Sequence, residues 1–467
     1  SKVLLRLESM GIDTIAGVPD STLKQFCDGL QTYGGSLRHY VTANEGAAVG
    51  VAIGTYLASG KPACVYMQNS GIGNIVNPLA SLANGDVYGV PMLFIVGWRG
   101  EPGVKDEPQH VFQGKITCEL FETLAVTYSV IDQNTSEEEM EAILQEAGLV
   151  LERGEQFAII VKKGTFEKEA PFSWSNGNPM EREEVLGHIL QALPRETAIV
   201  STTGKISREL YEQSDRIYGN HENLFMTVGG MGHASMIALG VAAKRPDKTV
   251  VCIDGDGAAL MHMGAMPFIA SQGLENFYHI VINNMAHESV GAMPTGCQQT
   301  SFADIAGAAG YRVVDKFKTL GEVDQIGKRI LEEKGPVLFE IPVALGARAD
   351  LGRPKESAKE NKETFMEFLK RVRISVIYMQ NEWKSLWNKR HGELDKMGEA
   401  ADNRKIFLEL KRSNGFDVVN ELTYDALYGQ YAETKKNLCP PRLQGGIRSV
   451  YEVGCGAGAN LFLFEEE

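Results

Sequence analysis

At 467 residues the chain is long enough for two or three domains, and 43% hydrophobic with 23% charged residues is a composition typical of globular proteins. The formal net charge of −14 argues against a nucleic-acid-binding surface, which would need clustered cations. The seven cysteines are scattered without a C-x-x-C pair, which argues against a zinc site or a disulfide framework.

The hydropathy pattern excludes a membrane-spanning segment as well. No apolar run reaches the roughly 18 residues that a helix needs to cross a bilayer, so we expect no membrane contact. Together with the scattered cysteines, this predicts a protein of the reducing cytoplasm.

In residues 1–170, apolar segments of strand length alternate with helical patterns. This alternation predicts an α/β domain with a mainly parallel sheet flanked by helices. The expected strands are residues 14–17, 39–41, 63–67, 92–96 and 157–161. Residues 171–181, which are rich in Ser, Asn, Gly and Pro, are predicted to form a linker.

Within this first domain, Glu45 follows the expected strand 39–41 and begins a helix. An acid at this position also favours the positive end of the helix dipole. Small residues then recur every three or four positions, a pattern that permits close helix packing. They are Ala47, Gly50, Gly54 and Ala58.

A second series of apolar strands predicts another α/β domain of similar size at residues 182–370. Its expected strands are residues 198–200, 250–253, 279–282 and 337–341. Beyond it the composition changes to charged amphipathic helix, so we expect a third, mostly helical segment at residues 371–467.

Two polar motifs follow neighbouring strands of the second domain. Strand 250–253 runs into Gly255-Asp256-Gly257, and Asn284 ends a later strand 28 residues after Asp256. A carboxylate and an amide at adjacent strand ends suit Mg²⁺, and glycines let the backbone approach a diphosphate. Each motif alone is more readily a turn or a helix cap, but together they are much more specific.

The two motifs at this spacing resemble the signature of enzymes that use thiamine diphosphate. The resemblance implies a Mg²⁺ ion held by Asp256, by the side chain of Asn284 and by the backbone carbonyl of Ala286. It also implies that Glu45 protonates N1′ of the cofactor's aminopyrimidine, which allows the 4′-nitrogen to deprotonate the thiazolium carbon.

The same resemblance assigns further cofactor contacts. Met231 stands 25 residues before Asp256, where the family places an apolar wedge between the cofactor rings, and the carbonyl of Gly229 would meet the pyrimidine amine. Thr202 and Thr203 would contribute to the diphosphate site. An ordinary core methionine and an ordinary strand-to-helix turn are the alternatives.

The chain closely resembles the phosphonopyruvate decarboxylases in residues 17–21, 97–110 and 202–210, and the resemblance extends from about residue 1 to 369. Like them it lacks the middle domain of larger thiamine-dependent decarboxylases and acetolactate synthases. The resemblance implies a carboxy-lyase that converts 3-phosphonopyruvate to phosphonoacetaldehyde and CO₂ in phosphonate biosynthesis. A sulfopyruvate decarboxylase is the alternative within the same group.

Candidate substrate groups follow from this resemblance. The residues that stand where related decarboxylases have polar active-site groups are Asp20, Ser21, Asn69 and His110. A phosphonate also needs fixed cations, for which a solvated surface position is the competing interpretation. The candidates are Arg99, Lys105, Lys205 and Arg208.

In the C-terminal segment, a strand-like stretch at 449–453 runs into Gly454-Cys455-Gly456-Ala457-Gly458. This resembles motif I of class I S-adenosylmethionine methyltransferases, so a partial methyltransferase-like segment is expected. A poorly structured extension remains equally open. A methyltransferase fused to a degenerate thiamine-fold scaffold is therefore a further functional alternative.

Glu45 and the metal motif lie on different predicted domains, and the family pairs such domains across subunits. We therefore expect a homodimer or higher homo-oligomer with its active site at the subunit interface.

Overall fold

The computed structural model describes residues 2–167, 172–290 and 292–371. The expected segment at 371–467, with its glycine-rich motif at 454–458, thus lies outside the described residues except for residue 371 itself.

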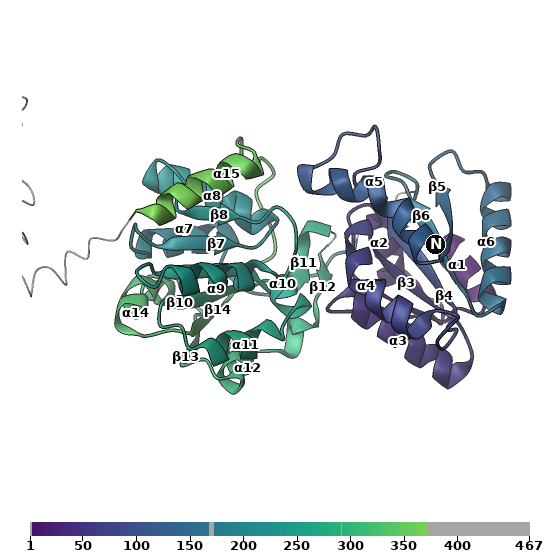
Figure 1. Ribbon diagram of the computed structural model, residues 1–467, viewed down its shortest axis with the longest axis horizontal. Helices are drawn as coiled ribbons and strands as arrows, with labels where there is room; N and C mark the ends of the chain where they lie inside the picture. Colours follow the sequence, from purple (N-terminus) through teal and green to yellow (C-terminus); the bar gives the residue numbers. More distant parts are fainter. Residues whose placement is uncertain (1, 168–171, 291, 372–467) are drawn as a thin grey trace, which may run out of the picture. The chain divides into compact units, whose positions relative to one another are not determined.

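The first domain contains a six-stranded, fully parallel sheet in the order β2-β1-β3-β4-β6-β5 (Figure 1). Its strands are β1 (Thr14–Gly17), β2 (Arg38–Val41), β3 (Ala63–Gln68), β4 (Met92–Gly97), β5 (Thr127–Ile131) and β6 (Gln156–Val161). Its helices are α1 (Lys2–Ser9), α2 (Lys24–Thr32), α3 (Glu45–Ser59), α4 (Ile72–Pro78), α5 (Pro108–Thr123) and α6 (Glu137–Glu152), with short turns η1 (Asn69–Gly71) and η2 (Leu79–Ala83).

Helices cover both faces of this sheet. Side chains of α1, α2 and α6 share one hydrophobic core with alternate strand residues, and those of α3, α4 and α5 share the other. Because β4 lies between two helical layers, all six of its residues are buried, which explains its unbroken apolar sequence.

The second domain contains another six-stranded, fully parallel sheet, in the order β13-β14-β10-β9-β7-β8. The strands are β7 (Ala198–Ser201), β8 (Leu224–Met226), β9 (Val250–Gly255), β10 (Phe277–Asn283), β13 (Val313–Lys316) and β14 (Val337–Pro342). One face carries α7 (Arg182–Ala192), α8 (Lys205–Tyr218), α13 (Leu320–Val323) and α14 (Ile326–Glu332). The other carries α9 (Ala234–Lys244), α10 (Asp256–Met261), α11 (Ala265–Gln272), α12 (Phe302–Ala309) and α15 (Ala358–Lys370).

The predicted α/β class with two parallel sheets is confirmed. Three strands of these two sheets had no counterpart in the sequence prediction: β5, β8 and β13. All three lie at sheet edges. Strands β5 and β13 are only partly buried, so polar residues interrupt their apolar pattern, and β8 has only three residues.

A loop leaves β10 and forms a small antiparallel pair, β11 (Ala286–His287) with β12 (Met293–Pro294), and the turns η3 (Glu288–Val290) and η4 (Gly296–Gln299). Parallel pairing of β10 with β9 places Ile282 opposite Gly255. The carboxyl ends of β7, β9 and β10 therefore meet at one edge of the second sheet, where ligands of open α/β sheets bind.

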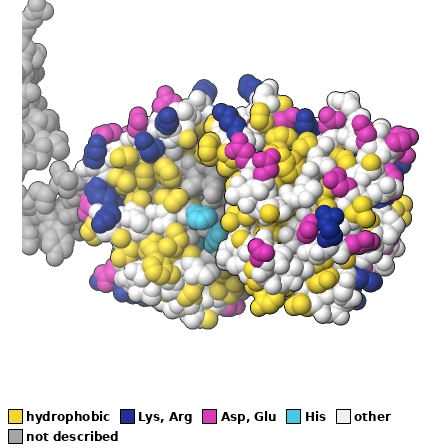
Figure 2. Space-filling view, turned by 45° about the vertical axis from the view of Figure 1, so that its right-hand side comes forward, with side chains coloured by type: hydrophobic (Ala, Val, Ile, Leu, Met, Phe, Trp, Pro, Cys, Tyr) yellow, Lys and Arg dark blue, Asp and Glu magenta, His cyan; other side chains and the backbone are white. Residues whose placement is uncertain are grey.

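Figure 2 shows acidic and basic side chains on the same face of the described chain, with hydrophobic side chains between them. Among the residues that the structure describes, no helix combines the length and the apolar character that crossing a bilayer requires.

Helix α15 completes the edge of the second sheet through a buried amide. The Asn361 side chain accepts from the backbone amide of Met226 (3.0 Å) and donates to the carbonyl of Leu224 (2.8 Å), both in edge strand β8. It thus replaces a missing neighbouring strand.

We expect Asn361→Ala to lower the free energy of unfolding by about 1–3 kcal/mol, because two buried backbone groups lose their partner. Urea unfolding measures the loss. The matched control is Glu363→Ala on the exposed side of the same helix, expected to change stability by less than about 0.5 kcal/mol. Equal losses in the two variants would contradict this role of the amide.

Candidate active site

The carboxylate of Asp256 stands at the carboxyl edge of the second sheet, at the start of α10. It is only 3% exposed, and the Thr295 hydroxyl donates to its Oδ2 (2.7 Å). Burial raises the pKa of Asp256 to about 6, although hydrogen bonds from Thr295 and nearby backbone amides oppose the shift. A buried carboxylate that pairs with no cation among the described residues fits a hard divalent ion such as Mg²⁺.

The first of the two asparagines after β10 has a structural task. The Asn283 side chain donates to the fully buried carboxylate of Glu340 (2.9 Å) and accepts from the backbone amide of Met285 (3.0 Å). Both ends of the Asn283 amide are therefore occupied within the fold.

The second asparagine is held differently. Asn284 donates through Nδ2 to Glu288 (2.8 Å), and its Oδ1 accepts from the backbone amide of Ala286 (3.1 Å). The backbone of Asn284 lies close enough to the Asp256 carboxylate to oppose the rise of its pKa, so these two residues lie side by side. Carboxylate, amide and backbone carbonyl oxygens form the donor set that Mg²⁺ prefers, so the residues present fit the ion.

Neighbouring side chains pack closely against the glycines at these strand ends. A Cβ atom on Gly257 would lie 3.3 Å from Met231 Cε and 3.2 Å from His287 Cε1. A Cβ on Gly255 would lie 3.3 Å from the Ile206 side chain and 3.9 Å from Thr202. The structure thus brings Met231 and Thr202 to the same motif. Burial lowers the pKa of His287 to about 4, so its imidazole is neutral near pH 7.

The loop that carries Met231 is fixed by its glycines and by a threonine. Gly230 and Gly232 have positive φ angles of 62° and 87°, and a Cβ on Gly232 would lie 3.0 Å from a backbone carbonyl of α10. Thr203 donates to the carbonyl of Val228 (3.1 Å), next to Gly229. Threonine and glycine positions assigned to the cofactor therefore belong to one connected surface.

On the first sheet, Glu45 begins α3 and is 4% exposed. Asn44 caps this helix by accepting from the amide of Ala47 (2.9 Å), and Asn74 donates to Glu45 Oε2 (2.6 Å). Burial raises the pKa of Glu45, and the Asn74 hydrogen bond opposes the shift. A raised pKa makes a carboxyl group easier to protonate, and a protonated carboxyl group can donate to a ring nitrogen. The sequence analysis did not identify Asn74.

Asp20 lies in the loop after β1 and is fully buried. Its Oδ2 accepts from the backbone amides of Thr22 (2.8 Å) and Leu23 (3.1 Å), whereas Oδ1 has no partner in the described structure. Burial raises the pKa of Asp20 to about 6, and these amides oppose the shift. A carboxyl group with this pKa is suited to proton transfer near neutral pH.

Three further candidates assemble around the loop after β4. Arg99 donates to Ser21 Oγ (3.0 Å) and, through Nε, to Asp106 (2.8 Å). Asn69 is fully buried, exchanges hydrogen bonds with the backbone of Arg99 (2.8 and 3.1 Å) and donates to Thr117 (2.9 Å). All functional groups of its amide are engaged within the protein, so Asn69 positions the arginine loop.

The other candidates are spread between the two sheets. At the start of α5, burial and the nearby arginine lower the pKa of His110. Lys105 is exposed, Arg208 is partly exposed, and Lys205 donates to Glu288 (2.7 Å). The structure therefore assembles Asp20, Ser21, Asn69 and Arg99 on the first sheet, but it does not bring the four cations into one cluster.

The sequence analysis missed a buried network beside the second motif. Arg182 forms a two-pronged ion pair with Glu209 (2.7 and 2.6 Å) and a second ion pair with Glu288. Glu288 also accepts from Lys205 and Asn284. In the sequence, only the position of Glu288, four residues after Asn284, could have indicated this network.

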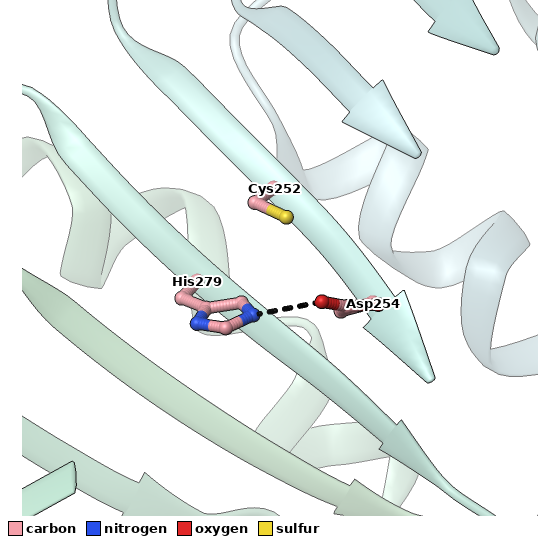
Figure 3. A group of neighbouring side chains, drawn as sticks. All are labelled: Cys252, Asp254 and His279. Carbon is pink, nitrogen blue, oxygen red and sulfur yellow. Dashed lines mark ion pairs between the residues drawn. The ribbon is translucent and has the colours of Figure 1, made fainter. Parts of the chain in front are cut away.

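A second unpredicted group lies on β9, just before the first motif in the chain, and on the neighbouring strand β10 (Figure 3). The ligand atoms of Cys252, Asp254 and His279 lie within 4.8 Å of one another, and Asp254 and His279 approach to 3.5 Å. Burial raises the pKa of the Cys252 thiol, so it stays protonated. Because Asp254 Oδ1 accepts from the amide of Gly255 (3.0 Å), we assign the group to holding the backbone that leads into α10.

Comparison with known proteins agrees with the two α/β domains of the fold. The family models for the thiamine pyrophosphate enzyme N-terminal and C-terminal TPP binding domains match residues 2–120 and 209–341. Phosphonopyruvate decarboxylases from Streptomyces hygroscopicus and Streptomyces viridochromogenes are 34% identical over 79% and 78% of this chain, and over 93% of their own length. A sulfopyruvate decarboxylase from Methanosarcina acetivorans is 29% identical over 63% of this chain and 78% of its own.

The raised pKa of Asp20 predicts a pH-dependent contribution to stability. The folded state holds this proton up to about pH 6, whereas the unfolded chain loses it near the ordinary value of 3.8. The contribution is thus fully present below that value and is lost as pH rises through about 6. We expect Asp20→Asn to gain stability over the natural protein across this window, by up to about 3 kcal/mol.

Urea unfolding at pH 4, 5, 6 and 7 measures the difference. Asp86→Asn, on an exposed turn, is the matched control and should give the same small difference at every pH. A constant difference for Asp20→Asn as well would contradict the raised pKa.

Proposed function

Because the chain belongs to the thiamine pyrophosphate-dependent decarboxylases, we propose that it converts 3-phosphonopyruvate to phosphonoacetaldehyde and CO₂ in phosphonate biosynthesis. The observation that carries the proposal is the 34% identity to two phosphonopyruvate decarboxylases over 93% of their length. Similarity to sulfopyruvate decarboxylase supports a sulfonate substrate as the second candidate. Both substrates are 2-oxo acids with an additional anionic group.

In this proposal the second sheet holds the cofactor. Asp256, Asn284 and the carbonyl of Ala286 would bind Mg²⁺, and the backbone at Gly255 and Gly257 would approach the diphosphate. Thr202, Thr203, Gly229 and Met231 would complete the cofactor site. When bound, thiamine diphosphate supplies the nucleophilic carbon and the electron sink that decarboxylation needs.

The first sheet provides the acid–base groups. Glu45 would hold a proton toward the pyrimidine ring, which its raised pKa supports. Asp20, with a pKa of about 6, would exchange a proton with the substrate, and His110 is a second candidate for that step. The burial of Asp20 and Glu45 supports a site from which water is excluded.

Arg99 is the cation that the structure best supports for the phosphonate. Its side chain is 22% exposed, and Asp106 and Ser21 fix its position. A fixed guanidinium matches the geometry of a phosphonate better than a mobile ammonium. Lys105, Lys205 and Arg208 remain secondary candidates, and the pairing of Lys205 with Glu288 reduces its availability.

A substrate panel tests the proposal. With thiamine diphosphate and Mg²⁺ present, we expect kcat/KM to be highest for phosphonopyruvate among phosphonopyruvate, sulfopyruvate, pyruvate and oxaloacetate, because the phosphonate carries more charge to pair with a fixed guanidinium. Released CO₂ is the measurement. A higher kcat/KM for sulfopyruvate would replace the first candidate by the second.

We also propose a cytoplasmic homodimer or higher homo-oligomer. Five cysteines in the described part of the chain are free thiols, which supports a reducing compartment. Exposed apolar side chains near α3, α4 and η2 support a subunit contact there. They include Leu57, Val76, Leu82, Val87 and Tyr88.

Complementation tests whether the active site lies between subunits. Glu45→Gln and Asp256→Asn should each lower kcat by about 10²-fold or more, because one removes the acid and the other a metal ligand. If the two groups act across subunits, coexpressed variants should regain about a quarter of the natural activity, since half of the dimers carry one intact site.

Light scattering gives the subunit number in the same samples, and Glu138→Gln on the exposed side of α6 is the control for a neutral substitution. Full activity in a monomer, or no recovery in mixed oligomers, would contradict a site shared between subunits.

A further inference from the structure

We infer that Glu288 is a positioning residue that sets the orientation of Asn284 for the metal ion; this inference rests on the proposed metal site. Asn284 Nδ2 donates to Glu288 Oε2 at 2.8 Å. A carboxylate only accepts hydrogen bonds, so it forces the NH₂ end of the amide toward itself. The carbonyl oxygen Oδ1, the end that a metal binds, must then point away.

A second hydrogen bond agrees with this orientation. The backbone amide of Ala286 donates to Asn284 Oδ1 at 3.1 Å, which again requires the oxygen on that side. Reversing the amide would place its NH₂ group against the amide of Ala286 and its oxygen against the carboxylate of Glu288. Both contacts would be repulsive, so the two partners select one orientation.

Glu288 itself is fixed by two cations. Its Oε1 accepts from Lys205 Nζ at 2.7 Å, and its Oε2 pairs with the Arg182 guanidinium. Because both oxygens are engaged by side chains of the second domain, Glu288 acts on the metal through Asn284 rather than as a ligand.

The charges of the group balance. Arg182 and Lys205 offset Glu209 and Glu288, and the Arg182 side chain is only 3% exposed while that of Glu288 is 9% exposed. A carboxylate paired with two cations in this way is held in one position. Arg182 and Lys205 therefore lie near the cofactor motif but are paired with carboxylates, which makes them less available to a substrate.

Binding of Mn²⁺ to the full chain with thiamine diphosphate, followed by electron paramagnetic resonance, tests this role without measuring catalysis. We expect Glu288→Gln to raise the Kd for Mn²⁺ by about 10- to 100-fold, the usual effect of losing a group that orients a metal ligand. Glu288→Asp keeps the charge beside Arg182 and Lys205 but shortens the reach to Asn284, and it should also weaken binding.

Glu209→Gln is the matched control, because within the described chain Glu209 shares the Arg182 ion pair but makes no hydrogen bond to Asn284. We expect it to lower the melting temperature while leaving the Kd for Mn²⁺ within about twofold, a change far smaller than the loss of an orienting group produces.

Five outcomes decide the matter. Weaker Mn²⁺ binding in both Glu288 variants, with Glu209→Gln unchanged, supports the inference. An unchanged Kd in the folded Glu288→Asp variant overturns it, and so does equal weakening in Glu209→Gln. If the natural protein itself shows no Mn²⁺ binding, or if Asp256→Asn binds Mn²⁺ as tightly as the natural protein, the proposed metal site fails first.

Discussion

The parallel pairing of β9 with β10 is the constraint on which the rest of the site depends. With Ile282 opposite Gly255, both strands end at the same level, and the residues that follow them meet outside the sheet. Asp256 and Asn284 are 28 positions apart in the sequence but adjacent in space. Because parallel strands require helical crossovers, both faces of this sheet are covered, and the motif residues are buried where an uncompensated carboxylate favours a cation.

Three polar side chains that follow these strands have partners within the described chain. Thr295 holds Asp256, Glu340 holds Asn283 and Glu288 holds Asn284. Buried polar groups without partners are costly, and a network that satisfies them also restricts their orientation. The two asparagines differ for this reason. The Asn283 amide holds the fold, whereas the Asn284 amide contacts the loop at Ala286.

The first sheet uses burial for a different purpose. Asp20 and Glu45 lie among few compensating charges, and desolvation raises the pKa of each. Arg99, in contrast, has a compensating charge, because Asp106 pairs with it, and Asn69 holds its backbone. The first domain thus provides protonatable acids and an oriented cation. The second domain provides oxygen ligands and glycine backbone. Thiamine chemistry in the proposed reaction needs both sets of groups.

The sequence by itself determined the α/β class and the two parallel sheets, and it singled out Glu45, Met231, Asp256 and Asn284 as candidates, because continuous apolar strands and short motifs are local signals. Three edge strands escaped prediction, since β5 and β13 are only partly buried and lack that pattern and β8 has only three residues. Only the tertiary structure decided which asparagine is occupied by the fold, that Glu288 and Arg182 surround the other, and that Asp20 is desolvated. Hydrogen-bond partners such as Asn283 and Glu340 lie 57 positions apart, and burial depends on packing against elements far away in the chain, so neither leaves a mark on the local sequence.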